Sequence, residues 1–66
     1  DMTMLHEFYG TPDNHPERKA VVFKENDGYS VLMIADKAII EDRKITGHSE
    51  RYAEDCAENW VLGVIT

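Results

Sequence analysis

Residues 49–66 read S-E-R-Y-A-E-D-C-A-E-N-W-V-L-G-V-I-T, and this stretch decides the predicted fold. Its apolar residues recur about four positions apart over several turns, which is the spacing of one face of an α-helix. The predicted inner face consists of Tyr52, Ala53, Cys56, Ala57, Trp60 and Val64. Ser49 precedes the pattern and is the expected N-cap, because its hydroxyl can accept a hydrogen bond from an early helix amide. The stretch therefore predicts one amphipathic helix that covers a core.

The opposite face of this helix is acidic. Glu50, Glu54 and Glu58 stand four apart, and Asp55 lies beside them. Like charges at this spacing each cost an isolated helix about 0.2–0.5 kcal/mol. The favoured interpretation is an ordinary solvated helix face. A surface kept for a partner is the alternative, which the small cost of the ridge to the helix itself supports.

The residues before the helix predict antiparallel strands. Two runs of branched and aromatic residues, 19–25 and 29–35, flank Asn26, Asp27 and Gly28. Such a sequence predicts a hairpin with either a type I′ turn at Asp-Gly or a three-residue loop in which the glycine is left-handed.

Three further segments complete the sheet. Residues 3–9 alternate and predict a first strand. One face would hold Met4, His6 and Phe8, and the other Thr3, Leu5, Glu7 and Tyr9. Residues 10–18 contain two prolines and a glycine, and they predict a long irregular loop. Residues 36–45 fit either a short helix or a strand. The strand is favoured, because the charged run E-D-R-K is typical of a protected sheet edge.

The predicted fold is α+β. Residues 1–66 form a single small domain in which a three- to four-stranded antiparallel sheet carries one C-terminal helix across one face, in the order β-β-β-β-α. A chain of this length is near the size at which a single core only just offsets the entropy of folding.

Charge and composition restrict the function. Thirteen acidic and seven basic side chains leave a net charge of −6, which argues against nucleic acid and against an anionic membrane. The charge favours a basic protein partner, or simply solubility. The single cysteine cannot close an internal disulfide, and neither a signal peptide nor a membrane span is recognisable, so the predicted location is the cytoplasm.

No residue is predicted to be catalytic, to bind a cofactor or to ligate a metal. Cys56 lies among apolar neighbours and acidic residues, so core packing is favoured over nucleophilic chemistry. His6, His15 and His48 fall in separate segments without ligand spacing. The sequence predicts a protein without enzymatic activity and without a cofactor. A weaker alternative function is nucleic-acid binding, in which bases stack on aromatic residues of the sheet face.

The end of the chain is apolar on all sides. In the run W-V-L-G-V-I, Leu62 and Ile65 cannot face the same sheet as the residues of the inner face. Either the segment 10–18 wraps this end, or the two residues form an exposed patch for a protein partner or a twofold dimer. The candidate partner-binding residues are Glu50, Glu54, Asp55, Glu58, Leu62 and Ile65.

The run Y-A-E-D-C-A-E-N-W-V-L-G, together with F-Y-G-T-P and A-V-V-F, resembles sequences of small uncharacterised proteins from tailed bacteriophages, including phages of marine cyanobacteria. The similarity covers residues 5–65. It implies a place in the cytoplasm of an infected bacterium, where small early phage proteins commonly bind and inhibit or redirect host proteins, and it implies no functional residues. The predicted function is a small acidic protein-binding module, and the alternative is a structural homo-oligomer formed through the C-terminal helix.

Overall fold

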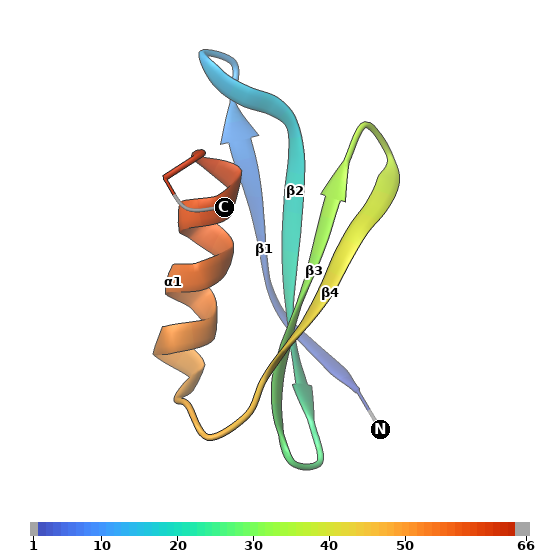
Figure 1. Ribbon diagram of the computed structural model, residues 1–66, viewed down its shortest axis with the longest axis vertical. Coiled ribbons are helices and arrows are strands. Elements are labelled where there is room, and N and C mark those ends of the chain that lie inside the picture. The colour runs from blue at the N-terminus through green and yellow to red at the C-terminus, as the bar shows by residue number, and fades with distance from the viewer. Residues whose placement is uncertain (1, 65–66) are drawn as a thin grey trace.

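The computed structural model describes residues 2–64 and arranges them as four strands followed by one helix (Figure 1). The elements are β1 (Thr3–Thr11), β2 (Asn14–Glu25), β3 (Gly28–Ala35), β4 (Ala38–Ile45) and α1 (Glu50–Val61). The strands form one antiparallel sheet in the order β1-β2-β3-β4, and α1 packs across one face, mainly against β2. The predicted β-β-β-β-α fold is confirmed, and the ambiguous segment 36–45 forms a strand.

The turn between β2 and β3 differs from both predicted forms. Glu25 pairs with Gly28, so Asn26 and Asp27 alone make the loop, and neither has a positive φ. Gly28 has a φ of 150°, and a Cβ at this position would lie 2.9 Å from the carbonyl oxygen of Ile45. The glycine is therefore needed where two backbones approach closely.

A turn with two left-handed residues does form, but between β3 and β4. Ala35 pairs with Ala38, and the two residues between them, Asp36 and Lys37, have φ values of 53° and 66°. Two positive φ angles are the mark of a type I′ turn, which matches the twist of the flanking strands. This turn was not predicted from the sequence, because it contains no glycine.

The prediction of a long irregular loop over residues 10–18 is wrong. Thr11 pairs with Asn14, so only two residues leave the ladder between β1 and β2. The strands pass through this region with a bulge after Tyr9 and a positive φ at His15. A Cβ at Gly10 would overlap the carbonyl group of His15, so the absence of a side chain at Gly10 lets the hairpin close.

The core lies between α1 and the sheet. Its buried members are Ala20, Val22, Val31, Met33, Ile45, Ala53, Cys56, Ala57, Trp60 and Val61. A bulge between Met4 and His6 changes the faces expected for β1, because it adds a residue to the strand. As a result Leu5 packs against the core on the same side as His6, and Met4 belongs to the opposite face.

The helix begins and ends with regular caps. The hydroxyl of Ser49 accepts a hydrogen bond from the Tyr52 amide at 3.2 Å, as predicted. At the other end Gly63 has a φ of 77°, its amide donates to the Trp60 carbonyl, and the Val64 amide donates to the Asn59 carbonyl. These two bonds form a Schellman motif, which ends the helix at a left-handed glycine.

Two residues of the predicted inner face lie outside the core. Val64 follows the left-handed Gly63, so it leaves the helical periodicity and is 68% exposed. Tyr52 is 49% exposed and stacks on the imidazole of His48, with ring centroids 3.9 Å apart. The other four predicted residues are buried, which confirms the inner face of the helix at its centre.

Candidate protein-binding surfaces

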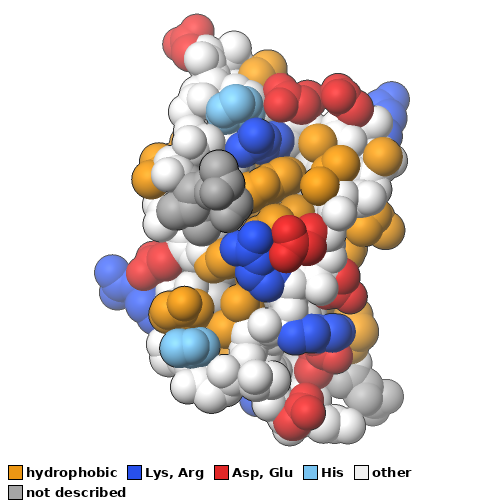
Figure 2. Space-filling view, in the orientation of Figure 1, with side chains coloured by type: hydrophobic (Ala, Val, Ile, Leu, Met, Phe, Trp, Pro, Cys, Tyr) orange, Lys and Arg blue, Asp and Glu red, His pale blue; other side chains and the backbone are white. Residues whose placement is uncertain are grey.

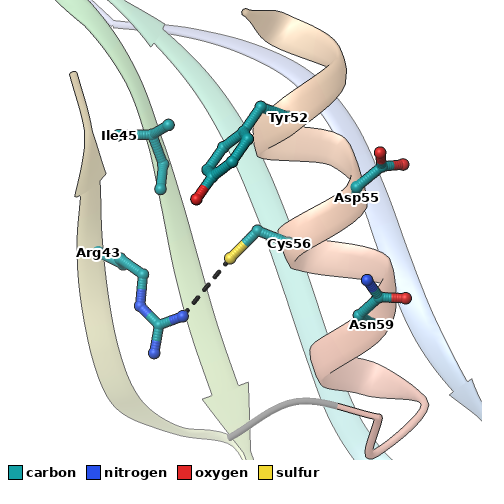
Figure 3. A pocket seen from close by; sticks show the side chains of 6 residues that line it. All are labelled: Arg43, Ile45, Tyr52, Asp55, Cys56 and Asn59. Atoms are coloured by element: carbon teal, nitrogen blue, oxygen red, sulfur yellow. Dashed lines mark hydrogen bonds between the residues drawn. The ribbon is translucent and has the colours of Figure 1, made fainter. Parts of the chain in front are cut away.

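A shallow groove runs between α1 and β4, because the helix covers β1 to β3 and leaves the same face of β4 largely uncovered. Figure 2 shows apolar side chains gathered in the hollow between the helix and the β3–β4 hairpin, with charged side chains among them. The groove has a volume of about 330 Å³. Its lining residues, drawn in Figure 3, are Arg43, Ile45, Tyr52, Asp55, Cys56 and Asn59.

Arg43 is the central polar residue of the groove. Its Nη1 donates to the Cys56 sulfur at 3.5 Å (Figure 3), and its Nε and Nη2 donate to the two carboxylate oxygens of Glu41 at 2.8 and 3.3 Å. These bonds hold the pKa of the Glu41 carboxyl below its ordinary value. A guanidinium donates hydrogen bonds and accepts no proton, so Arg43 cannot act as a general base towards the Cys56 thiol.

Arg43 is not among the partner-binding residues predicted from the sequence. The signal was present, because Arg43 and Ile45 are two apart in a strand and so share a face. Their common face became the wall of a groove only because the helix stops short of β4, and no sequence pattern states how far a helix reaches across a sheet.

The predicted acidic ridge divides into two parts in the structure. Glu54 accepts a hydrogen bond from His6 Nδ1 of β1 at 2.8 Å, and this bond lowers the pKa of its carboxyl. Its side chain is only 22% exposed, so Glu54 belongs to the contact between helix and sheet. Glu50, Asp55 and Glu58 are exposed, and Asp55 lies 3.7 Å from the Arg51 guanidinium.

The hairpin of β1 and β2 holds the C-terminal end of the helix. Arg18 donates to the Trp60 carbonyl at 2.6 Å and lies 4.7 Å from the centre of the indole, and Asn14 donates to the Leu62 carbonyl. Leu62 is half-buried and packs against the core. Of the two alternatives for this end, the described part supports wrapping by residues 10–18. Ile65 lies outside the described residues.

The face of the sheet opposite α1 is a second candidate surface, here called the open sheet face. Its side chains follow from the strand register: Met4 pairs with Phe23, Val21 with Leu32, and Ile34 with Ile39. Within residues 2–64 the single helix packs on the other side of the sheet. The apolar residues of the open sheet face are Met4, Tyr9, Val21, Phe23, Leu32, Ile34 and Ile39.

Among residues 2–64 no group of three or more His, Cys, Asp or Glu side chains is placed to hold a metal ion. His6, His15 and His48 lie on β1, at the start of β2 and before α1. No helix within the same residues has the length and apolar character needed to cross a membrane.

Comparison of the chain with known protein-family models, with curated proteins and with solved structures gives no match in any of the three. The resemblance to small phage proteins therefore stays a prediction, and a proposal for function depends on the surfaces of the molecule.

Proposed function

We propose that the protein is a small non-enzymatic module that binds another protein through the groove between α1 and β4. The observation that carries this proposal is the groove itself, which joins apolar walls to an exposed aromatic ring and has one acidic residue at its rim. Ile45, Cys56 and the ring of Tyr52 supply the apolar part, and Asp55 stands at the rim. Mixed surfaces of this kind, with an aromatic anchor and a charged border, are typical of protein interfaces.

The charge of the helix indicates the chemistry of the partner. Glu50, Asp55 and Glu58 are exposed on α1, and the whole chain carries a charge of −6. A partner segment with one apolar anchor and flanking lysine or arginine residues would complement both the groove and its rim. In the setting implied by the phage resemblance, the partner is a host protein of the infected bacterium, and binding inhibits or redirects it.

The test is capture of the partner followed by measured affinities. The immobilised protein is exposed to a lysate of the bacterial host, retained proteins are identified by mass spectrometry, and the dissociation constant of the purified pair is measured by calorimetry. The diagnostic variant is Asp55→Lys with Glu58→Lys, since both side chains are exposed and neither anchors the helix to the sheet. We expect affinity to fall at least about tenfold, or about 1.4 kcal/mol.

A matched control separates a specific rim from net charge. Asp13→Lys with Asp27→Lys changes the charge equally, but in the two turns that precede β2 and β3. We expect this control to keep the affinity within about twofold. If both double variants weakened binding equally, the acidic residues would act only through the net charge of the protein. If neither variant changed the affinity, Asp55 and Glu58 would not belong to the interface.

A further inference from the structure

We propose that the open sheet face is the contact surface of a twofold homodimer, in which two copies of the chain pack sheet against sheet. This goes beyond the proposed function, because it uses the opposite side of the molecule and leaves the groove free. The occupant is a second copy of this chain, as the pattern, the charge and the area of the face indicate.

The pattern of the open sheet face is that of an interface with an apolar centre. Val21 and Leu32 lie opposite each other on the two central strands, next to Phe23 and Ile34. Val21 is only 4% exposed although no described element covers it, so its neighbours already shield it from water. Ile39, at the edge on β4, is 67% exposed. The apolar side chains of this face that stay partly exposed, which are Phe23, Leu32, Ile34 and Ile39, would be covered in a packed pair of sheets.

The charges on this face are neutralised within the face. Lys19 Nζ lies 3.2 Å from the Glu7 carboxylate, and Lys44 Nζ lies 2.9 Å from Glu25 and 3.6 Å from Asp42. The two lysines face three carboxylates, so the face carries about one negative charge out of the six on the chain. A surface with so little net charge does not call for a strongly charged partner, and it suits another surface of the same kind.

The position of the remaining charge also favours a second copy. The acidic helix lies on the opposite side of the sheet, so a sheet-to-sheet dimer places the two helices on its outer surfaces. With the sheets about 10 Å apart, the helices are separated by more than about 20 Å, which exceeds the Debye length of about 8 Å at physiological ionic strength. A dimer formed through the helices would instead bring their acidic side chains together.

The area of the face sets the expected strength. Four strands about 4.8 Å apart, with about eight residues rising about 3.3 Å each, outline roughly 19 by 26 Å. Two such faces in contact bury about 1,000 Å² even before the relief of the side chains is counted, which reaches the lower end of specific interfaces. We therefore expect a dimer with a dissociation constant in the micromolar range.

The experiment is sedimentation velocity from about 1 µM to 1 mM protein in 150 mM salt. We expect the mass to rise from 7.6 kDa towards twice that value as the concentration increases. Ile39→Glu places a charge on the open sheet face at an exposed site and should weaken the dimer at least about thirtyfold. The control Tyr52→Glu adds the same charge at an exposed site in the groove and should leave the dimer unchanged.

Each outcome supports or overturns the proposal. Circular dichroism of both variants first establishes that they keep the wild-type fold, which their exposed positions favour. A monomer at every concentration overturns the proposal, and so does a dimer that Tyr52→Glu disrupts while Ile39→Glu does not. A rise from 50 to 500 mM salt should preserve the dimer or strengthen it, because the contact is apolar and the chains repel each other. Dissociation at high salt would indicate a contact held by charge and would also overturn the proposal. Because partner capture depends on the groove variants, either proposal can fail while the other stands.

Discussion

Alternate residues of the same two strands meet very different surroundings on the two faces of the sheet. On the side of α1, Val22, Val31 and Met33 are almost completely buried. On the opposite side Val21 is buried by its neighbours, but Leu32 and Ile34 are only half-buried. The side chains are of one kind, and the difference is that α1, the one helix among residues 2–64, packs on one face of the sheet. In a chain of 66 residues, stability is therefore concentrated in one layer, and the open sheet face remains available for contact.

The largest expected effect comes from removing the largest apolar side chain between α1 and the sheet. Trp60 of α1 is buried between the helix and the sheet, so Trp60→Ala leaves a cavity and should cost about 3–5 kcal/mol of unfolding free energy. In a domain this small, such a loss is enough to unfold much of the population. Urea unfolding followed by circular dichroism measures it.

The matched variant on the open sheet face is Tyr9→Ala. Tyr9 is largely exposed, and its hydroxyl donates to Glu7 at the surface, so we expect a loss of less than about 1 kcal/mol. Similar losses for the two aromatic residues would break the distinction between the faces, because the open sheet face would then contribute as much to the monomer as the core does.

A smaller effect is expected at the C-terminal end of α1, where Arg18 of β2 contacts Trp60. Arg18→Met keeps much of the side-chain volume but removes the hydrogen bond to the Trp60 carbonyl and the cation above the indole. We expect a loss of about 1.5–3 kcal/mol, because a charged donor to a helix C-terminus also complements the helix dipole. Arg51→Met, on the outer side of α1, is the control and should cost less than about 0.5 kcal/mol. If Arg18→Met left the free energy of unfolding unchanged, this would contradict the view that the β1–β2 hairpin anchors the helix.

The burial of Trp60 and the contact of Arg18 with the helix end differ in how far the sequence predicts them. The burial of Trp60 follows from the four-residue spacing of the helix, and the strands follow from long runs of branched residues. The contact of Arg18 with the Trp60 carbonyl does not follow from the sequence, because it joins positions 42 apart through a hairpin whose sequence looks like a loop. The residues of the open sheet face are likewise not fully predicted by the sequence. The bulge at Leu5 moves Met4 to the open sheet face, and simple alternation gives no sign of such an added residue.

The smallest effect concerns ion pairs, one on each face, and it appears as a pH dependence. Glu54 is hydrogen-bonded to His6 across the helix–sheet contact, and Glu7 is paired with Lys19 on the open sheet face. Both pairs lower the pKa of the carboxyl below its ordinary value of 4.5. A carboxyl with a lowered pKa in the folded state stabilises the fold above its ordinary pKa, and this stabilisation is lost as the pH falls through the lowered value.

The melting temperature should therefore fall between pH 5 and pH 2.5, and both Glu54→Gln and Glu7→Gln should make that fall smaller than in the wild type. Differential scanning calorimetry across this range measures the change. Because the Glu54 pair joins the helix to β1 while the Glu7 pair lies within the sheet, only Glu54→Gln should also speed hydrogen exchange at the N-terminal half of α1 at pH 6. An equal change in exchange for both variants would mean that the His6–Glu54 contact does not hold the helix on the covered face. A fall in melting temperature as steep as in the wild type would show that these carboxylates add nothing to stability on either side of the sheet.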